Sequence, residues 1–138
     1  MNVLALVLLA LTGGLGYDDA ADAAKKDLEK LQGEWQLTVG GDDGPRMVIK
    51  GNEYTVSGGM DEKGTLKLDP SKKPAVVDID ITEGNDKGKK QYGIYRIEGD
   101  KFTLCVAEAG AEADDRPKEF KSDQDAGTAV LVFKRVKK

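Results

Sequence analysis

Most of the chain alternates between apolar and polar residues, which is typical of β-strands that bury one face. The alternation begins at Trp35, where Leu37 and Val39 share the face of the tryptophan and the residues between them are polar. Seven similar segments follow, and turns that contain glycine or proline separate most of them. The pattern predicts eight strands, at residues 35–39, 46–50, 53–57, 64–69, 75–82, 91–97, 101–107 and 128–136.

The connections between these segments are short, except for a long one over residues 107–127. Eight short strands joined by tight turns indicate an antiparallel meander, which either closes as a barrel or packs as a sandwich. A chain of 138 residues has room for one such domain. The predicted fold class is therefore all-β.

Two of the predicted hairpins have similar sequences. IKGNEYTV (49–56) and IEGDKFTL (97–104) each place glycine at a two-residue turn. Either one hairpin design is used twice, or the barrel is a duplicated half-barrel. In both cases the strand period predicts that Thr55 and Thr103 face outward. The residues predicted to face inward are Ile49, Tyr54 and Val56 in the first hairpin, and Ile97, Phe102 and Leu104 in the second.

One helix is predicted, over residues 18–31. Its apolar stripe is narrow and consists of two alanines followed by Leu28 and Leu31. Acidic residues open the segment, lysines occupy its second half, and Gly33 follows its end, all of which suit a helix. So narrow a stripe predicts a short helix that docks mainly through the two leucines.

The first 16 residues are predicted to be a signal peptide. They carry no charged side chain, and their apolar run at residues 3–11 is about half as long as a membrane-spanning helix. Glycines at positions 14 and 16 offer a cleavage site before Tyr17. The alternative is a buried N-terminal strand or helix. The signal peptide predicts a secreted or periplasmic protein that does not span the membrane and has one mature domain, residues 17–138.

Composition narrows the functional classes. A net charge of −4 and an isoelectric point near 4.9 argue against a nucleic-acid partner, which requires a basic surface. The basic C-terminal KRVKK is interpreted as a solvated strand end. The chain has one cysteine, Cys105, and no histidine. An internal disulfide, serine–histidine or cysteine–histidine catalysis and most zinc sites are therefore excluded.

No motif predicts catalysis. Residues 78–89 begin like a calcium-binding EF-hand loop, but they lack its glycine at position six and its glutamate at position twelve. Gly84 and Gly88 are one residue too close for a phosphate-binding loop. None of the acidic residues has surroundings that predict a raised pKa. We therefore expect a protein that is not an enzyme, with no metal site and no cofactor.

Two other features are interpreted as structural. Cys105 lies on the strand face opposite Phe102, where a lone cysteine is usually inert packing. Residues 108–120 form the longest segment without periodicity, which is either a binding loop or a mobile connection. Arg116 and Lys118 lie among acidic residues in this segment and are expected to pair with them.

Several segments of the chain together resemble a known family. In order, they are LQGEWQL (31–37), IKGNEYTV (49–56), GTLKLDPSKKPAVVDI (64–79), ITEGNDKGKKQYGIYRIEGDKFTLC (81–105), RPKEF (116–120) and VLVFKR (130–135). They cover nearly all of residues 28–136 and are similar to uncharacterised lipocalin-like domains abundant in planctomycete bacteria. The resemblance implies a secreted, calycin-type up-and-down barrel of eight strands with a short N-terminal helix and no established activity.

Gly33 and Trp35 match the Gly-x-Trp signature that opens the first strand of lipocalin-type barrels. In lipocalins a basic residue near the end of the last strand lies across this tryptophan, and the resemblance implies that Arg135 does so here, with Lys134 as the alternative. Such a guanidinium gains cation–π attraction and keeps donors for helix carbonyls. Trp35 would then mark the closed end of the barrel, opposite a binding end. The short chain, missing disulfide and few aromatic residues argue against a deep cavity.

Three functions are considered for such a barrel, which is either filled by its own side chains or holds one small ligand. The first is a secreted, non-enzymatic protein that binds a small apolar molecule in the barrel. The second is an extracellular interaction module with a solid core, whose loops 40–46 and 107–127 contact a protein or polymer. The third is a hydrolase or isomerase that uses carboxylates. The residues expected to line a ligand cavity are Leu37, Ile49, Tyr54, Val56, Leu66, Tyr95, Phe102, Leu104 and Leu131.

Overall fold

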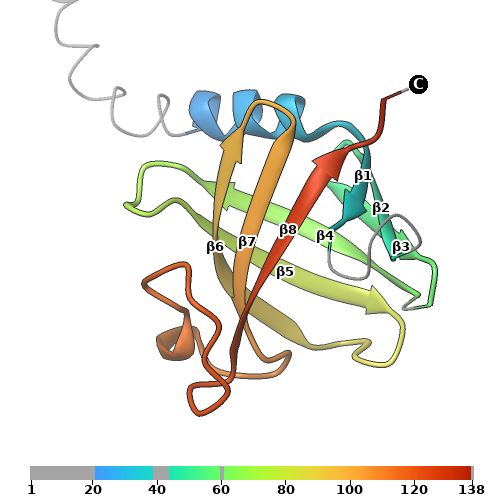
Figure 1. Ribbon diagram of the computed structural model, residues 1–138. Helices are drawn as coiled ribbons and strands as arrows, with labels where there is room; N and C mark the ends of the chain where they lie inside the picture. Colours follow the sequence, from blue (N-terminus) through green and yellow to red (C-terminus); the bar gives the residue numbers. More distant parts are fainter. Residues whose placement is uncertain (1–20, 39–43, 60, 138) are drawn as a thin grey trace, which may run out of the picture.

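The computed structural model of the protein describes residues 21–38, 44–59 and 61–137. The predicted signal peptide, the start of the predicted helix, Val39 and residues 40–43 lie outside the described residues. Within the described chain, eight strands form one closed antiparallel barrel (Figure 1). The strands are β1 (Gly33–Leu37), β2 (Arg46–Lys50), β3 (Glu53–Ser57), β4 (Glu62–Asp69), β5 (Val76–Glu83), β6 (Lys90–Glu98), β7 (Lys101–Ala107) and β8 (Thr128–Arg135).

Each strand pairs with the next along the chain, and β1 pairs with β8 to close the barrel. A helix covers residues 21–31, and the short 3₁₀ helix η2 covers Ala113–Asp115. The predicted fold class is therefore confirmed as an all-β, eight-stranded, up-and-down antiparallel barrel with a short N-terminal helix. Every strand begins and ends within two residues of its predicted limits, because alternation and turn residues mark both ends.

The two similar hairpins have the expected tight turns. Gly51 and Gly99 adopt positive φ angles of 63° and 61°, a conformation that glycine enters without steric cost. The inward side chains predicted in these hairpins lie in the core, although one, Ile97, is only partly buried at its edge. Thr55 is exposed on the outer face, as predicted.

Thr103 also lies on the outer face of β7, as predicted, but it is only 2% exposed there. The segment that follows β7 folds back over this face. The Phe120 ring lies 4.5 Å from the guanidinium of Arg96, which pairs with Thr103 across β6 and β7. The Thr103 hydroxyl is buried without a hydrogen-bond partner in the described part of the chain. Strand parity predicts the direction of a side chain, but not what covers it.

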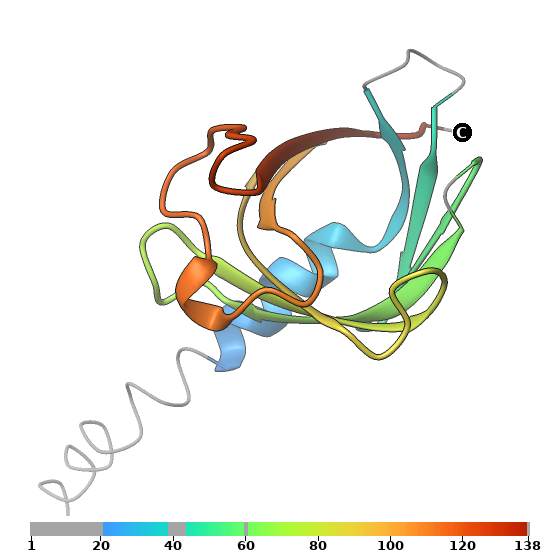
Figure 2. The same ribbon diagram turned by 90° about the horizontal axis from the view of Figure 1, so that it is seen from below.

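The helix at residues 21–31 lies across one end of the barrel, and Figure 2 views the barrel from the other end. Leu31 is fully buried and Leu28 packs against the edge of the core, in agreement with the predicted docking. Asp27 of the helix accepts a 2.6 Å hydrogen bond from the Tyr95 hydroxyl. We call this the closed end. The open end is the opposite one, where β1, β3, β5 and β7 finish.

Candidate functional site

The barrel contains a cavity of about 290 Å³ that extends from the open end into the core. This volume lies at the lower limit of small-molecule pockets, which range from ~300 to ~1,000 Å³. Most of its walls are apolar side chains from strands around the barrel. The cavity is lined by Leu37, Pro45, Met47, Tyr54, Val56, Glu62, Leu66, Ile79, Asp86, Gln91, Phe102, Leu104, Val106, Ala129, Leu131 and Phe133.

Seven of the nine residues predicted to line a cavity do so. The other two, Ile49 and Tyr95, are buried inside the barrel but lie away from the cavity. Ile49 pairs with Gly33 at the start of β1, and Tyr95 contacts the helix through Asp27, so both belong to the closed end. The seven lining residues are Leu37, Tyr54, Val56, Leu66, Phe102, Leu104 and Leu131.

Other lining residues were not among those predicted. Five of them are apolar residues on the inward face of a predicted strand, and the alternation could have identified them: Met47, Ile79, Val106, Ala129 and Phe133. The remaining four lie at or beside the strand ends that border the open end: Pro45, Glu62, Asp86 and Gln91. Periodicity carries no information about Pro45 and Asp86, which lie outside the strands. Glu62 and Gln91 share strand parity with Leu66 and Tyr95, but they are polar, so a pattern of apolar inward positions does not include them.

Tyr54 connects the apolar wall to the polar opening. Its ring lies against Gly64 of β4, where an added Cβ would stand 2.7 Å from the Tyr54 hydroxyl oxygen. The hydroxyl donates a 2.7 Å hydrogen bond to Glu62 Oε2. Burial, followed by the hydrogen bond and the charge of Glu62, raises the pKa of Tyr54 far above its usual value. Tyr54 therefore remains a neutral donor to the carboxylate.

The alkaline titration of the protein should reflect this burial. Tyr54 and Tyr95 both have raised pKa values in the folded state, mainly through burial, so the folded protein holds these protons more tightly than the unfolded chain does. Stability from this source is complete below the ordinary tyrosine pKa of ~10 and declines as the pH rises beyond it. We expect their phenolate absorbance to appear only as the circular dichroism of the barrel is lost. Difference spectra against Tyr54→Phe and Tyr95→Phe assign the signals, and ionisation near pH ~10 in a folded barrel would contradict the prediction.

The closed end contains the three residues of the expected signature. The Arg135 guanidinium lies 4.3 Å from the centre of the Trp35 ring, and the two residues are paired across β8 and β1. Arg135 also donates hydrogen bonds to the carbonyl oxygens of Lys30 and Gln32 at the end of the helix. Gly33 leaves room for it, since an added Cβ would stand 3.2 Å from Arg135 Nη1.

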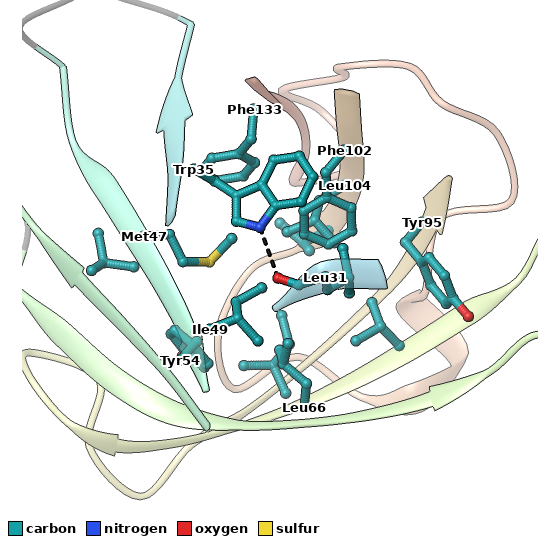
Figure 3. Close-up of a cluster of buried hydrophobic side chains, with 14 of the residues drawn as sticks. Leu31, Trp35, Met47, Ile49, Tyr54, Leu66, Tyr95, Phe102, Leu104 and Phe133 are labelled. Carbon is teal, nitrogen blue, oxygen red and sulfur yellow. Dashed lines mark hydrogen bonds between the residues drawn. The ribbon is translucent and has the colours of Figure 1, made fainter. Parts of the chain in front are cut away.

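Trp35 is fully buried beneath this arginine, while the alternative basic residue, Lys134, is exposed. The indole nitrogen donates a 2.8 Å hydrogen bond to the carbonyl oxygen of Leu31, as Figure 3 shows. The Trp35 ring also packs at 5.7 Å from that of Phe102. The helix, the first strand and the last strand are therefore joined at one tryptophan.

A second group of contacts holds residues 108–127 against the outside of the barrel. Arg116 donates hydrogen bonds to the carbonyl oxygens of Val77 and Gly93, at 3.0 and 2.9 Å, and to Asp78 at 2.6 Å. The expected pairing of Arg116 with an acid is present, although this acid lies on β5 and not in the segment itself. Cys105 is fully buried under the segment, 3.6 Å from the carbonyl oxygen of Lys121, and burial raises the pKa of its thiol.

In residues 21–38, 44–59 and 61–137, no three histidine, cysteine, aspartate or glutamate side chains are grouped so that they could hold a metal ion. No helix within these same ranges has the length and apolar character needed to cross a membrane.

No family model, no curated protein and no solved structure matches the chain.

Proposed function

We propose that the protein is an exported, non-enzymatic barrel that binds a small apolar molecule in its open-end cavity. The observation that carries the proposal is the cavity itself, which is about 290 Å³ in volume and lined mainly by aliphatic and aromatic side chains. An apolar concave site with few polar groups is the usual form of a small-molecule pocket. At ~30 Å³ per water-sized group, it accommodates on the order of ten non-hydrogen atoms.

Two features of the sequence support the export and the lipocalin-like character in this proposal. The uncharged, apolar N-terminal segment is typical of a signal peptide. The Gly33 and Trp35 signature, with Arg135 over the indole, has the arrangement implied by the resemblance to lipocalin-like domains. Neither feature identifies the ligand. The first lies in the N-terminal segment of the sequence, and the second lies at the closed end of the barrel, opposite the cavity.

Blocking the opening should abolish binding of an apolar probe. Ala129 lines the cavity and is exposed, so a tryptophan at this position can fill the opening without displacing the core. We expect isothermal titration calorimetry to detect 1-octanol binding to the native protein and a loss of at least tenfold in affinity in Ala129→Trp. Val48→Trp is the matched control, since Val48 is 44% exposed outside the cavity.

The same experiment can overturn the proposal. If 1-octanol does not bind the native protein, or binds Ala129→Trp equally well, the cavity is not the binding site. Native mass spectrometry of protein purified from its own host adds a direct observation, because a retained ligand would appear as added mass that is absent from Ala129→Trp.

An interaction module is the second candidate function. It is favoured by an outer groove of about 730 Å³ between the β4–β5 turn and residues 113–118. Four basic side chains and one acidic side chain line this groove, although the chain as a whole is acidic. They are Lys72, Lys73, Arg116, Lys118 and Asp114. If the cavity binds no apolar probe, this groove is the surface at which to seek an extracellular protein or polymer.

A further inference from the structure

The polar groups that line the cavity present acceptors to a ligand. Glu62 and Asp86 contribute carboxylates. Gln91 donates one amide N–H to the carbonyl oxygen of Ala107, at 3.0 Å, and keeps its amide oxygen as an acceptor, together with its second N–H. The hydroxyl of Tyr54 is already donated to Glu62. No lysine or arginine is among the described residues that line the cavity.

The two carboxylates come from neighbouring segments at the opening of the cavity, which we call its rim. Gly84, at the start of the β5–β6 turn, packs so closely on Glu62 that an added Cβ would stand 3.3 Å from its Cα. Asp86 follows two residues later in the same turn and lines the same cavity. The turn that packs against Glu62 therefore also contributes a second carboxylate to the lining of the apolar cavity.

These charges differ in how far the protein neutralises them. Asp86 lies 3.5 Å from Lys89 in an exposed ion pair, which is weak. Glu62 is half-buried, its hydrogen-bond partner is the neutral Tyr54, and it forms no ion pair within the described chain. A ligand that brings an anion to this opening meets like charge, whereas a cation meets an acceptor with no basic partner.

We infer that the ligand is a small amphiphile whose apolar chain occupies the cavity and whose cationic amine lies at the rim, against Glu62 and Asp86. The inference rests on the proposed function, because it assigns a chemical class to the ligand of that same cavity. The ammonium group suits the site through its charge and its N–H donors, which match a rim of acceptors. A metal ion suits it less, since the described residues include no group of three ligands.

A matched series of probes tests this assignment. Octylammonium, 1-octanol and octanoate share the same apolar chain and differ in the charge of the head group. We expect octylammonium to bind at least tenfold more tightly than 1-octanol, and octanoate to bind most weakly, in calorimetric titrations at low salt. The preference for octylammonium should decrease as salt is added, because exposed charges are screened.

Variants that each remove one negative charge show which carboxylate causes the preference for octylammonium. In Glu62→Gln the amide oxygen can still accept the Tyr54 hydrogen bond, so the fold is retained while the charge is lost. We expect this variant to lose most of the preference for octylammonium and to keep its affinity for 1-octanol. Asp86→Asn should have a smaller effect. Glu53→Gln is the matched control, since Glu53 is exposed in the first position of β3, at the closed end.

The outcomes separate this inference from the function on which it rests. Equal binding of all three probes, or tighter binding of octanoate, overturns the amine assignment and leaves the apolar cavity as a binding site. Failure of every probe to bind overturns the proposed function, and the assignment with it. An unchanged preference in Glu62→Gln and in the double variant with Asp86→Asn shows that the rim carboxylates do not select the ligand.

Discussion

Replacing Trp35 with alanine should lower the free energy of unfolding by about 3–5 kcal/mol, which is the usual cost of deleting a large buried aromatic side chain. The substitution removes a fully buried indole, its hydrogen bond to Leu31 and its contact with Phe102. It also leaves the Arg135 guanidinium without its aromatic partner. Denaturant unfolding followed by circular dichroism measures the change, and the melting temperature should fall by about 10–20 °C.

Two further variants distinguish the contribution of Arg135 to stability from that of Trp35. Arg135→Ala retains the indole but loses the cation–π contact and two hydrogen bonds to helix carbonyls, so we expect a loss of about 1–3 kcal/mol and altered Trp35 fluorescence. Lys134→Ala removes the same charge from an exposed neighbour and should change stability by less than about 0.5 kcal/mol. If Arg135→Ala leaves both the stability and the fluorescence unchanged, Arg135 does not support the closed end.

Replacing Arg116 with alanine should release residues 108–127 from the barrel. Arg116 makes three hydrogen bonds from this segment to β5 and β6, and its guanidinium lies 5.1 Å from the Tyr92 ring centre. Because the side chain is about one-fifth exposed, we expect a loss of about 2–3 kcal/mol in global stability, and not more.

The reactivity of the Cys105 thiol, which lies beneath residues 108–127, measures whether this segment has been released. Cys105 is fully buried, and its raised pKa disfavours the reactive thiolate, so a thiol reagent should react slowly with the folded protein. In Arg116→Ala we expect labelling to be at least tenfold faster, which corresponds to ~1.4 kcal/mol in the local opening equilibrium. Lys118→Ala is the control, since Lys118 lies exposed on the same segment. Equal labelling rates in the two variants would show that Arg116 does not hold the segment in place.

The barrel could be predicted from the sequence because each strand is marked by a local alternation of apolar and polar residues. Leu37, Val56 and Leu104 face the interior for the reason that predicted them: each lies two positions from another apolar residue, and so on the same strand face. However, the alternation of apolar and polar residues does not show how far along the barrel axis an inward-facing residue lies. Ile49 has the same parity as Met47, yet only Met47 lines the cavity, because Ile49 lies two register pairs closer to the helix.

The rim and the outer surface depend on contacts between segments that are distant in the sequence. Glu62 acquires its position from Tyr54 and from the turn that brings Gly84 against it. Thr103 is buried because a later, non-periodic segment folds over it. Composition at these positions is polar in both cases, so the sequence pattern alone predicts exposure. Only the three-dimensional arrangement shows which polar residues face the cavity and which lie under another segment.

The pairing of the first strand with the last has a consequence for the order of events during synthesis. β8 completes the barrel by pairing with β1, and the bond from Arg135 Nη1 to Gln32 joins residues 103 positions apart. Until the last strand has been made, β1 and β7 each present a row of unpaired backbone groups, which is the form of sheet that associates with other chains. Completion of β8 therefore converts an open sheet with two unpaired edge strands into a closed barrel without such edges.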